Sequence, residues 1–299
     1  MRNVEMSLLF PTRFSESCFQ AIPAVAQWMD DVSCSLTITH VYHPRNTNMF
    51  EAEAQLRSFF AEADRYPNTR RVLLSGEDAA GVLAEYLGGH RHDLVVAPAS
   101  DRVGLPRPFH RSTRAHLLAH SDTAVWTMGT AMDSRVFRRP ARVGCMISRR
   151  SDSRRPLDLA CEYALRVGAT LQLLYLVPEV HEGMLRNAVG YDEPLTAMVA
   201  LEDLQRIAAT LPVTPELHSV VGSDAQRVLG LLRNSRTDIL FVGKHAAAHR
   251  SLFRDEMNRF VDVAECPVVC VDQDRALPLW ALRKPVVQPQ AAALVATAS

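Results

Sequence analysis

The feature that most constrains the fold is an internal repeat that divides the 299 residues into two similar halves. The segment SGEDAAGVLAEYLGGHRHDLVVAPA, residues 75–99, parallels VGSDAQRVLGLLRNSRTDILFVGKH, residues 221–245. In both segments a glycine and an acidic helix start precede apolar residues at i, i+3 and i+4, and Asp93 or Asp238 then precedes a short apolar run. Because about 150 residues is an ordinary domain size, the repeat predicts two similar domains.

Each half alternates short apolar strands with amphipathic helices, which is typical of βαβ units. We expect strands near 4–10, 35–42, 70–75, 93–98 and 123–128, and again near 142–147, 170–177, 216–221, 238–243 and 267–272. The predicted fold is therefore α/β, with two doubly wound five-stranded parallel sheets related by a pseudo-twofold axis. The last strand of each half is an apolar edge strand, and an exposed edge of that kind promotes aggregation. We therefore expect these two strands to pair or pack together.

The predicted domains are residues 1–129 and 142–273, with a linker at 130–141. The tail, residues 274–299, has no periodicity and is expected to be disordered. No window approaches the roughly 18 apolar residues that a membrane helix needs, which argues against membrane insertion. The N-terminus lacks the apolar stretch of a signal peptide, and none of the six cysteines lies in a CxxC pair, so we expect reduced thiols and a cytoplasmic protein.

Ligands of doubly wound sheets bind beyond the carboxyl ends of the strands, where the winding reverses. This rule directs attention to the ends of the first and fourth strands. The segments concerned are 10–17 and 97–113 in the first half, and 146–153 and 242–258 in the second.

The order of elements, the DLVV and DILFVG strands and the closing AECPVVCVD resemble a tandem universal stress protein, over about 3–129 and 142–273. The resemblance implies an adenine nucleotide α-hydrolase-like fold. Nucleotide-binding members of that family have an Asp at the end of the first strand and a Gly-x-x-Gly-x9-Gly-Ser/Thr loop after the fourth. The glycines let backbone N–H groups approach phosphates, and the loop ends at a helix N-terminus that favours an anion.

The first half departs from this pattern at nearly every position. Arg13 stands at the Asp position, and the glycine positions fall on Pro98, Asp101 and Arg111, so that only Ser112 is kept. Proline has no N–H to offer a phosphate, and arginine adds bulk where open backbone is needed. We therefore expect no ATP binding in the first half.

The second half keeps more of the pattern. Ser148 stands at the Asp position, Gly243 is retained, and Ala246 replaces the second glycine. The loop is two residues short, which places Arg254 and Asp255 at the Gly-Ser positions. If ATP or another anion binds anywhere, this half is the better candidate.

Arginines surround the predicted ligand positions in both halves. Arg13 and the pair Arg149 and Arg150 follow the first strand of each half, and Arg111 and Arg254 correspond at the fourth helix start. One interpretation is an anion site for phosphate or a phosphorylated metabolite, in which Arg149 and Arg150 form one wall of a cleft with Gly243 and Arg254. The other is a solvated rim of arginines paired with nearby carboxylates. The sequence leaves both open.

Other motifs give weaker signals. His90 and His92 in GHRHD could contribute to a metal site, but a loop before a strand explains them better, because no second ligand cluster is evident. Ser112 lies near His110 and His116, yet no carboxylate is placed to complete a catalytic triad. The sequence therefore predicts no catalytic residue and no metal ligand.

Charge is unevenly distributed, because residues 102–155 hold twelve arginines and three aspartates while the whole chain has a net charge of zero. No aromatic residues alternate with these arginines, so nucleic-acid binding is not favoured. We expect a non-enzymatic stress-response regulatory or interaction protein with little or no conventional ATP binding, either a monomer with an intramolecular pseudo-dimer or a homodimer, with an unidentified protein partner. The alternative is a sensor of a nucleotide or other anionic ligand, or a weak phosphotransfer enzyme, that uses the arginine-lined pocket of the second half.

Overall fold

The computed structural model describes residues 6–32, 34–98, 113–129, 132, 139–147, 154–177, 202–221, 225–244 and 259–272. The first half contains β1 (Met6–Thr12), α1 (Glu16–Asp31), β2 (Cys34–Tyr42), α2 (Met49–Ser58), the 3-10 helix η1 (Ala61–Arg65), β3 (Thr69–Ser75), α3 (Ala79–Gly89), β4 (Leu94–Ala97), α4 (Thr113–His120) and β5 (Ala124–Thr127). The second half contains β6 (Arg142–Ile147), α5 (Arg154–Val167), β7 (Thr170–Val177), β8 (Glu216–Val221), α8 (Ala225–Ser235), β9 (Ile239–Gly243) and β10 (Val268–Val271). Residues 202–208 and 259–263 are also helical.

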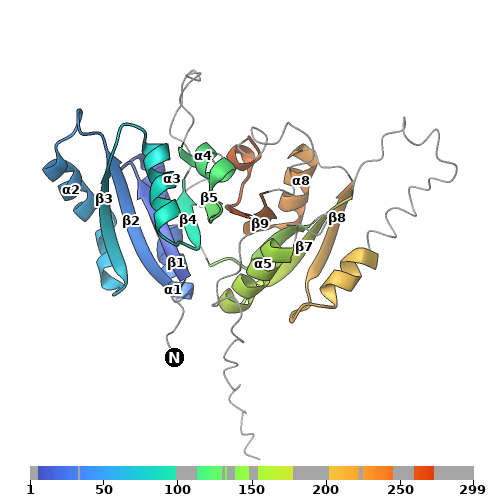
Figure 1. The fold of residues 1–299 in the computed structure, drawn as a ribbon. Coiled ribbons are helices and arrows are strands. Elements are labelled where there is room, and N and C mark those ends of the chain that lie inside the picture. Colours follow the sequence, from blue (N-terminus) through green and yellow to red (C-terminus); the bar gives the residue numbers. More distant parts are fainter. Residues whose placement is uncertain are drawn as a thin grey trace, which may run out of the picture.

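All ten predicted strands are present, but they form one ten-stranded sheet rather than two separate sheets (Figure 1). The order is β3-β2-β1-β4-β5-β10-β9-β6-β7-β8, so the second half repeats the order of the first in reverse, as a twofold axis would arrange it. Every neighbouring pair is parallel except β5 and β10, which run antiparallel with Trp126 opposite Val269. The predicted contact between the two apolar edge strands is therefore confirmed as backbone pairing.

Strand β1 continues two residues beyond its predicted end, through Pro11 to Thr12. A proline has no N–H for a sheet ladder and is normally confined to edges. In β1 it is tolerated because β4 pairs only with Leu8 and Leu9, so that one side of Pro11 has no ladder, while β2 follows β1 along its full length on the other side. The carboxyl end of β1 thus extends past β4 at the place where doubly wound sheets usually bind their ligands.

The repeated aspartates of the two halves have the same structural role. Asp93 accepts a hydrogen bond from Ser7 N at 2.8 Å, and Asp238 accepts from Ala141 N at 2.9 Å and Arg142 N at 2.8 Å. Each carboxylate therefore satisfies backbone donors at the start of the first strand of its half. The acidic helix start of the repeat also has a role, since Asp78 accepts from two backbone N–H groups and caps α3.

One hydrophobic core crosses both halves on one face of the sheet. It contains buried residues of α1 and η1 from the first half and of α5 from the second, and the rings of Trp28 and Tyr163 stack with centroids 4.4 Å apart. On the opposite face each half has its own smaller core. Because α1 and α5 share one core, neither half buries its apolar surface fully without the other.

The two halves also meet along the antiparallel strands, and we call this junction the seam. It comprises β5 and β10 with four flanking residues: Arg114, Gly129, Lys244 and Asp262. A side chain cannot replace the hydrogen of Gly129, because a Cβ there would lie 2.2 Å from the backbone oxygen of Val261. The backbones are therefore in close contact across the seam.

Candidate functional site

The predicted ligand position of the first half is a small cavity. Strands β1 and β4 are neighbours, and their carboxyl ends open into a space of about 50 Å³. Its described lining includes buried Thr12 and Thr39, together with Arg13 and Pro98 from the segments that the sequence singled out. Arg13 is exposed at the rim. Pockets that hold drug-sized ligands measure roughly 300–1,000 Å³, and the cavity that the described residues form is smaller than this range.

Arg114, in the first turn of α4, also lines this cavity, but its charge is directed to the other half of the protein. One terminal nitrogen donates to the carboxylate of Asp262 at 2.6 Å, across the seam. The side chain is only 6% exposed, and within the described ranges its Nε and Nη1 have no hydrogen-bond partner. A buried guanidinium with one described carboxylate partner is costly to desolvate, so we expect this ion pair to add little net stability across the seam.

The second half has the predicted arrangement at its own switch point, which is the place in the sheet where the winding of the strands reverses direction. Strands β6 and β9 are neighbours, so the loops that follow Ile147 and Gly243 leave the same edge of the sheet, as the sequence predicted. Gly243 is buried at the end of β9. Near this edge Arg155, in the first turn of α5, donates through Nη1 to the backbone oxygen of Asp272 at 2.5 Å. That bond connects the start of α5 to the end of β10.

Lys244 follows Gly243 and reaches across the seam into the first half. Its ammonium donates to the backbone oxygen of Thr123 at 2.8 Å and also to that of Ser121. Burial lowers the pKa of Lys244 to about 8, although Asp272 and Asp122 lie near enough to oppose the shift. The Lys244 ammonium group therefore donates to two backbone carbonyl groups directly before β5.

Most of the predicted binding residues lie outside the described residues. These are Arg111, Ser112, Ser148, Arg149, Arg150 and Arg254. The structure describes Arg13, which directly follows β1, and Gly243, the last residue of β9. Their roles in ligand binding stay predictions.

The two histidines of GHRHD have structural surroundings. His90 Nδ1 is 3.0 Å from the backbone oxygen of Tyr86, and His92 Nδ1 is 3.0 Å from Ser7 Oγ. Within the described ranges, no group of three or more His, Cys, Asp and Glu side chains is arranged to hold a metal ion. All six cysteines are buried free thiols, as expected.

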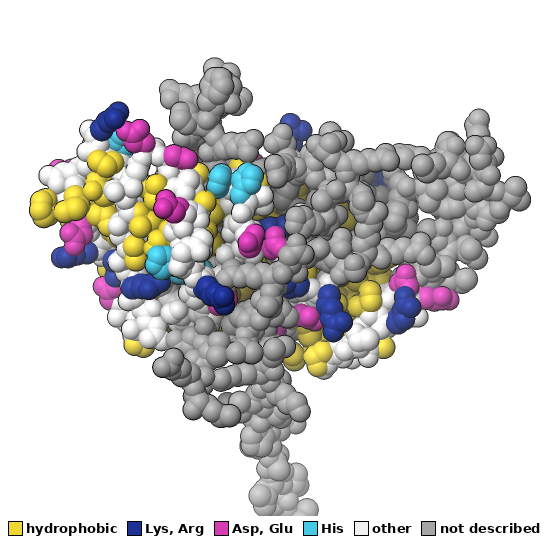
Figure 2. All heavy atoms as spheres, in the orientation of Figure 1, with side chains coloured by type: hydrophobic (Ala, Val, Ile, Leu, Met, Phe, Trp, Pro, Cys, Tyr) yellow, Lys and Arg dark blue, Asp and Glu magenta, His cyan; other side chains and the backbone are white. Residues whose placement is uncertain are grey.

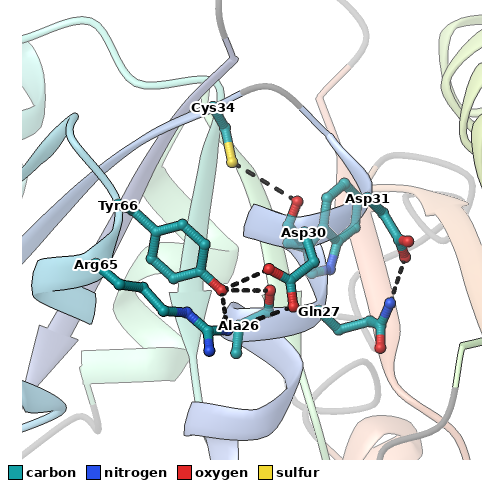
Figure 3. A network of polar contacts seen from close by, with 8 residues as sticks. Ala26, Gln27, Asp30, Asp31, Cys34, Arg65 and Tyr66 are labelled. Atoms are coloured by element: carbon teal, nitrogen blue, oxygen red, sulfur yellow. Dashed lines mark hydrogen bonds and ion pairs between the residues drawn. The ribbon is translucent and has the colours of Figure 1, made fainter. Parts of the chain in front are cut away.

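A polar network at the end of α1 connects this helix to two other segments (Figure 3). The hydroxyl of Tyr66 donates to Asp30 at 2.7 Å, and Arg65 donates to the same hydroxyl. The neighbouring Asp31 accepts from Gln27 at 2.7 Å and lies 3.3 Å from Arg139 in the predicted linker. The network connects α1 to Tyr66 and to Arg139.

Sequence reasoning missed the three charged residues of the seam. Arg114 and Asp262 are 148 positions apart in the chain, and Lys244 and Thr123 are 121 apart. The available signal was Lys244, because it is one of only two lysines in a chain that otherwise uses arginine. A point charge with three donors suits two converging carbonyl groups better than a planar guanidinium does.

Comparison with protein families shows that residues 141–272 match the model described as "Universal stress protein family". Comparison with curated proteins finds no match. No helix in the described part of the chain is long and apolar enough to cross a membrane.

Several solved structures share the fold over nearly the whole chain. A universal stress protein from Archaeoglobus fulgidus matches with a TM-score of 0.63 and 12% identity, over 89% of this chain and 96% of that one. A putative universal stress protein from Pseudomonas aeruginosa matches with a TM-score of 0.62 and 13% identity, over 90% and 94%. The cytoplasmic domain of a prokaryotic cation chloride cotransporter matches with a TM-score of 0.51 and 14% identity, over 93% and 100%.

These similarities support the sequence interpretation to different extents in the two halves. The family model covers the second half, while the fold similarity extends over both. Residues 141–272 therefore match the universal stress protein family, and the chain as a whole has the α/β fold seen in universal stress protein structures.

Proposed function

We propose that this chain is a non-enzymatic regulatory or interaction protein of the universal stress type, with no nucleotide bound in its first half. The observation that carries the proposal is the size of the cavity beside β1 and β4, about 50 Å³ in the described part of the chain. The space that these residues form is the size of a few water molecules, below the range of pockets for drug-sized ligands. Pro98 lines the cavity as well and has no N–H for a phosphate.

The use of the cations near both switch points supports the same proposal. Arg114, Arg155 and Lys244 lie near the ends of strands where a nucleotide-binding member needs donors for phosphate. Each of them instead donates to a carboxylate or a backbone carbonyl of this chain. Donors used in this way stabilise one arrangement of the two halves, which suits a rigid surface for a protein partner better than it suits catalysis.

Isothermal titration of the full chain with ATP, AMP and cyclic nucleotides tests this proposal. We expect no binding with a dissociation constant below about 10 µM, which corresponds to roughly −7 kcal/mol, and no release of phosphate from ATP. The Arg149→Ala/Arg150→Ala variant removes two arginines of the second-half pocket. If this variant still binds ATP more tightly than the limit, the nucleotide binds outside that pocket, and the proposal for the first half is wrong.

A second candidate function is a sensor of phosphate or a phosphorylated ligand in the second half, and binding of ATP as a cofactor belongs to this candidate as well. The observation in its favour is that β6 and β9 are neighbours, so that the segments holding Ser148, Arg149 and Arg150 and the one holding Arg254 begin at one edge of the sheet beside Gly243. Guanidinium groups can contact phosphate oxygens in a bidentate manner.

Thermal unfolding in millimolar phosphate, AMP or ATP tests the second candidate. A ligand that binds only the native state raises the free energy of unfolding, by about 2.7 kcal/mol at a hundred times its dissociation constant. We expect Arg149→Ala/Arg150→Ala to remove this stabilisation and Arg154→Ala to retain it, because the Arg154 side chain is 90% exposed and lies 4.0 Å from Asp158. If none of these anions shifts the wild-type transition, the arginines form a solvated rim.

A further inference from the structure

A surface cleft lies at the amino ends of β9 and β10, on the edge of the sheet opposite the switch point of the second half. The two strands are parallel neighbours, so the residues that precede them lie side by side. The cleft measures about 260 Å³ and is formed between the end of α8 and the segments before both strands. Four charged side chains, two of each sign, belong to its described lining: Arg233, Arg236, Asp238 and Glu265.

The same cleft has an apolar part. Leu229, Leu232 and Cys266 line it, and each is at most 5% exposed. Burial raises the pKa of the Cys266 thiol to about 12, with further contributions from the charges of Asp238 and Glu265. Both carboxylates therefore lie close to one apolar surface, so the cleft offers charge and apolar contact together.

The two carboxylates are only partly used by the protein itself. Asp238 accepts the backbone N–H groups of Ala141 and Arg142 at 2.9 and 2.8 Å, in both cases through Oδ2. Glu265 accepts from Arg233 Nε at 2.8 Å and lies 2.6 Å from Nη2, in both cases through Oε1. Within the described ranges, Asp238 Oδ1 and Glu265 Oε2 accept no hydrogen bond.

Arg236 is the cation of the cleft that has no described side-chain partner. It is exposed and directly follows α8, with a left-handed φ of 52°. Glycine is usual at this position of a helix end, because it adopts such a φ without steric cost. The chain therefore keeps a long charged side chain at a position where the backbone favours none, and such local conflicts are expected at functional sites.

We propose that this cleft binds a free α-amino acid with a short apolar side chain. The α-carboxylate would pair with Arg236, and the ammonium group would donate to Asp238 Oδ1 and Glu265 Oε2. The apolar side chain would contact Leu229 and Leu232. This assignment uses the unfilled cation and both unfilled carboxylate oxygens, so ligand and cleft are complementary in charge.

The size of the cleft and the surface around it agree with this ligand. A volume of about 260 Å³ lies just below the roughly 300–1,000 Å³ of pockets for drug-sized ligands, which suits a single amino acid. Figure 2 shows Lys and Arg side chains interspersed with Asp and Glu over the described surface of that face. Selectivity for a zwitterion must therefore come from local groups such as these. The inference is independent of the proposed function, because it uses neither switch-point pocket.

Isothermal titration of the full chain with L-valine and two analogues tests the assignment. Isovalerate lacks the ammonium group of valine, and isobutylamine lacks its carboxylate. We expect L-valine to bind with a dissociation constant of about 1 mM or below. Each analogue should bind at least about tenfold more weakly, because each lacks one charged hydrogen-bonding group. If L-valine does not bind, or if isovalerate binds as tightly, the amino-acid assignment is wrong.

Arg236→Gly separates a role in binding from a role in folding. The variant should weaken L-valine binding by at least about tenfold, because it removes the partner of the α-carboxylate. It should not lower the thermal midpoint of the ligand-free chain, since glycine adopts the left-handed conformation without strain. The matched control is Arg57→Gln, an exposed arginine on α2 in the first half, which should leave the affinity unchanged. Unchanged affinity in Arg236→Gly would overturn the proposal.

A further measurement on the wild-type chain locates the ligand without any variant in the cleft. With leucine methyl groups labelled with ¹³C, unlabelled L-valine should shift the signals of Leu229 and Leu232, which line the cleft. The methyl signals of Leu8 and Leu36, which are fully buried in the first half, should not move. Saturable shifts confined to leucines outside the cleft would show that the amino acid binds elsewhere and would refute the site.

Discussion

Replacing Asp262 with alanine should destabilise the protein much more than replacing its partner Arg114. Among the described residues, Asp262 is the hydrogen-bond acceptor of the Arg114 guanidinium, which is 6% exposed and whose Nε and Nη1 have no partner there. Asp262→Ala removes this acceptor. Removing one partner of a buried ion pair and leaving the other charge buried costs about 3–5 kcal/mol. We therefore expect a loss of this size in the free energy of unfolding.

The reverse substitution, Arg114→Met, should have a small effect. Asp262 is 42% exposed, so water can solvate its carboxylate once the arginine is gone. Methionine preserves much of the apolar stem of arginine and requires no hydrogen bond, and exchanging a buried ion for an apolar side chain is often neutral or stabilising. We expect a change within about 1 kcal/mol, and the double variant should be close to Arg114→Met alone.

Urea denaturation of the wild type, both single variants and the double variant measures this asymmetry. The matched control is the same cycle on Arg57 and Glu53, an exposed pair on α2 at 2.7 Å, for which we expect a coupling of about 0.3–0.5 kcal/mol. If Arg114→Met costs as much as Asp262→Ala, the burial argument is wrong and the pair stabilises the seam by direct attraction.

Three further outcomes are expected. Gly129→Ala should lower the free energy of unfolding by up to about 3 kcal/mol, because its Cβ would lie 2.2 Å from a backbone oxygen across the seam. Gly230→Ala in α8 has open space around its Cβ and should raise the free energy of unfolding by about 0.5–1 kcal/mol, as measured by urea denaturation. Burial raises the pKa of the Cys266 and Cys270 thiols to about 12, so both stay protonated in the folded state while the unfolded thiols ionise near about 8.5. Their contribution to stability should be complete below that pH and fall as pH rises toward 12; Cys266→Ala and Cys270→Ala should flatten the decline measured at pH 8–10. Neither half expressed alone should show a cooperative thermal transition by calorimetry, because α1 and α5 share one core; a sharp transition for an isolated half would contradict this.

Much of the architecture could be predicted from the sequence because it depends on local patterns. Apolar runs of strand length, alternating with amphipathic helices, located all ten strands, and the repeat indicated two copies of one unit. The exception was the end of β1. Its continuation through Pro11 depends on how few residues of β4 pair with it, which no local pattern reveals.

The joining of the two halves was only partly predictable. Apolar edge strands in both halves indicated that they would meet, but apolar character suits both face packing and backbone pairing. The antiparallel register of β5 and β10, and the close approach at Gly129, are settled by the fit of two whole half-domains.

The candidate sites show the same division. The residue types at the ends of the first and fourth strands, such as Arg13 and Gly243, were evident from the sequence because strand ends follow from periodicity. The partners of Arg114 and Lys244 were not, since each contact joins residues more than a hundred positions apart. The sequence determines which charges lie at the strand ends, and only the tertiary structure decides whether a charge contacts a ligand, solvent or the other half, because long-range Coulomb and hydrogen-bond partners depend on distance in space.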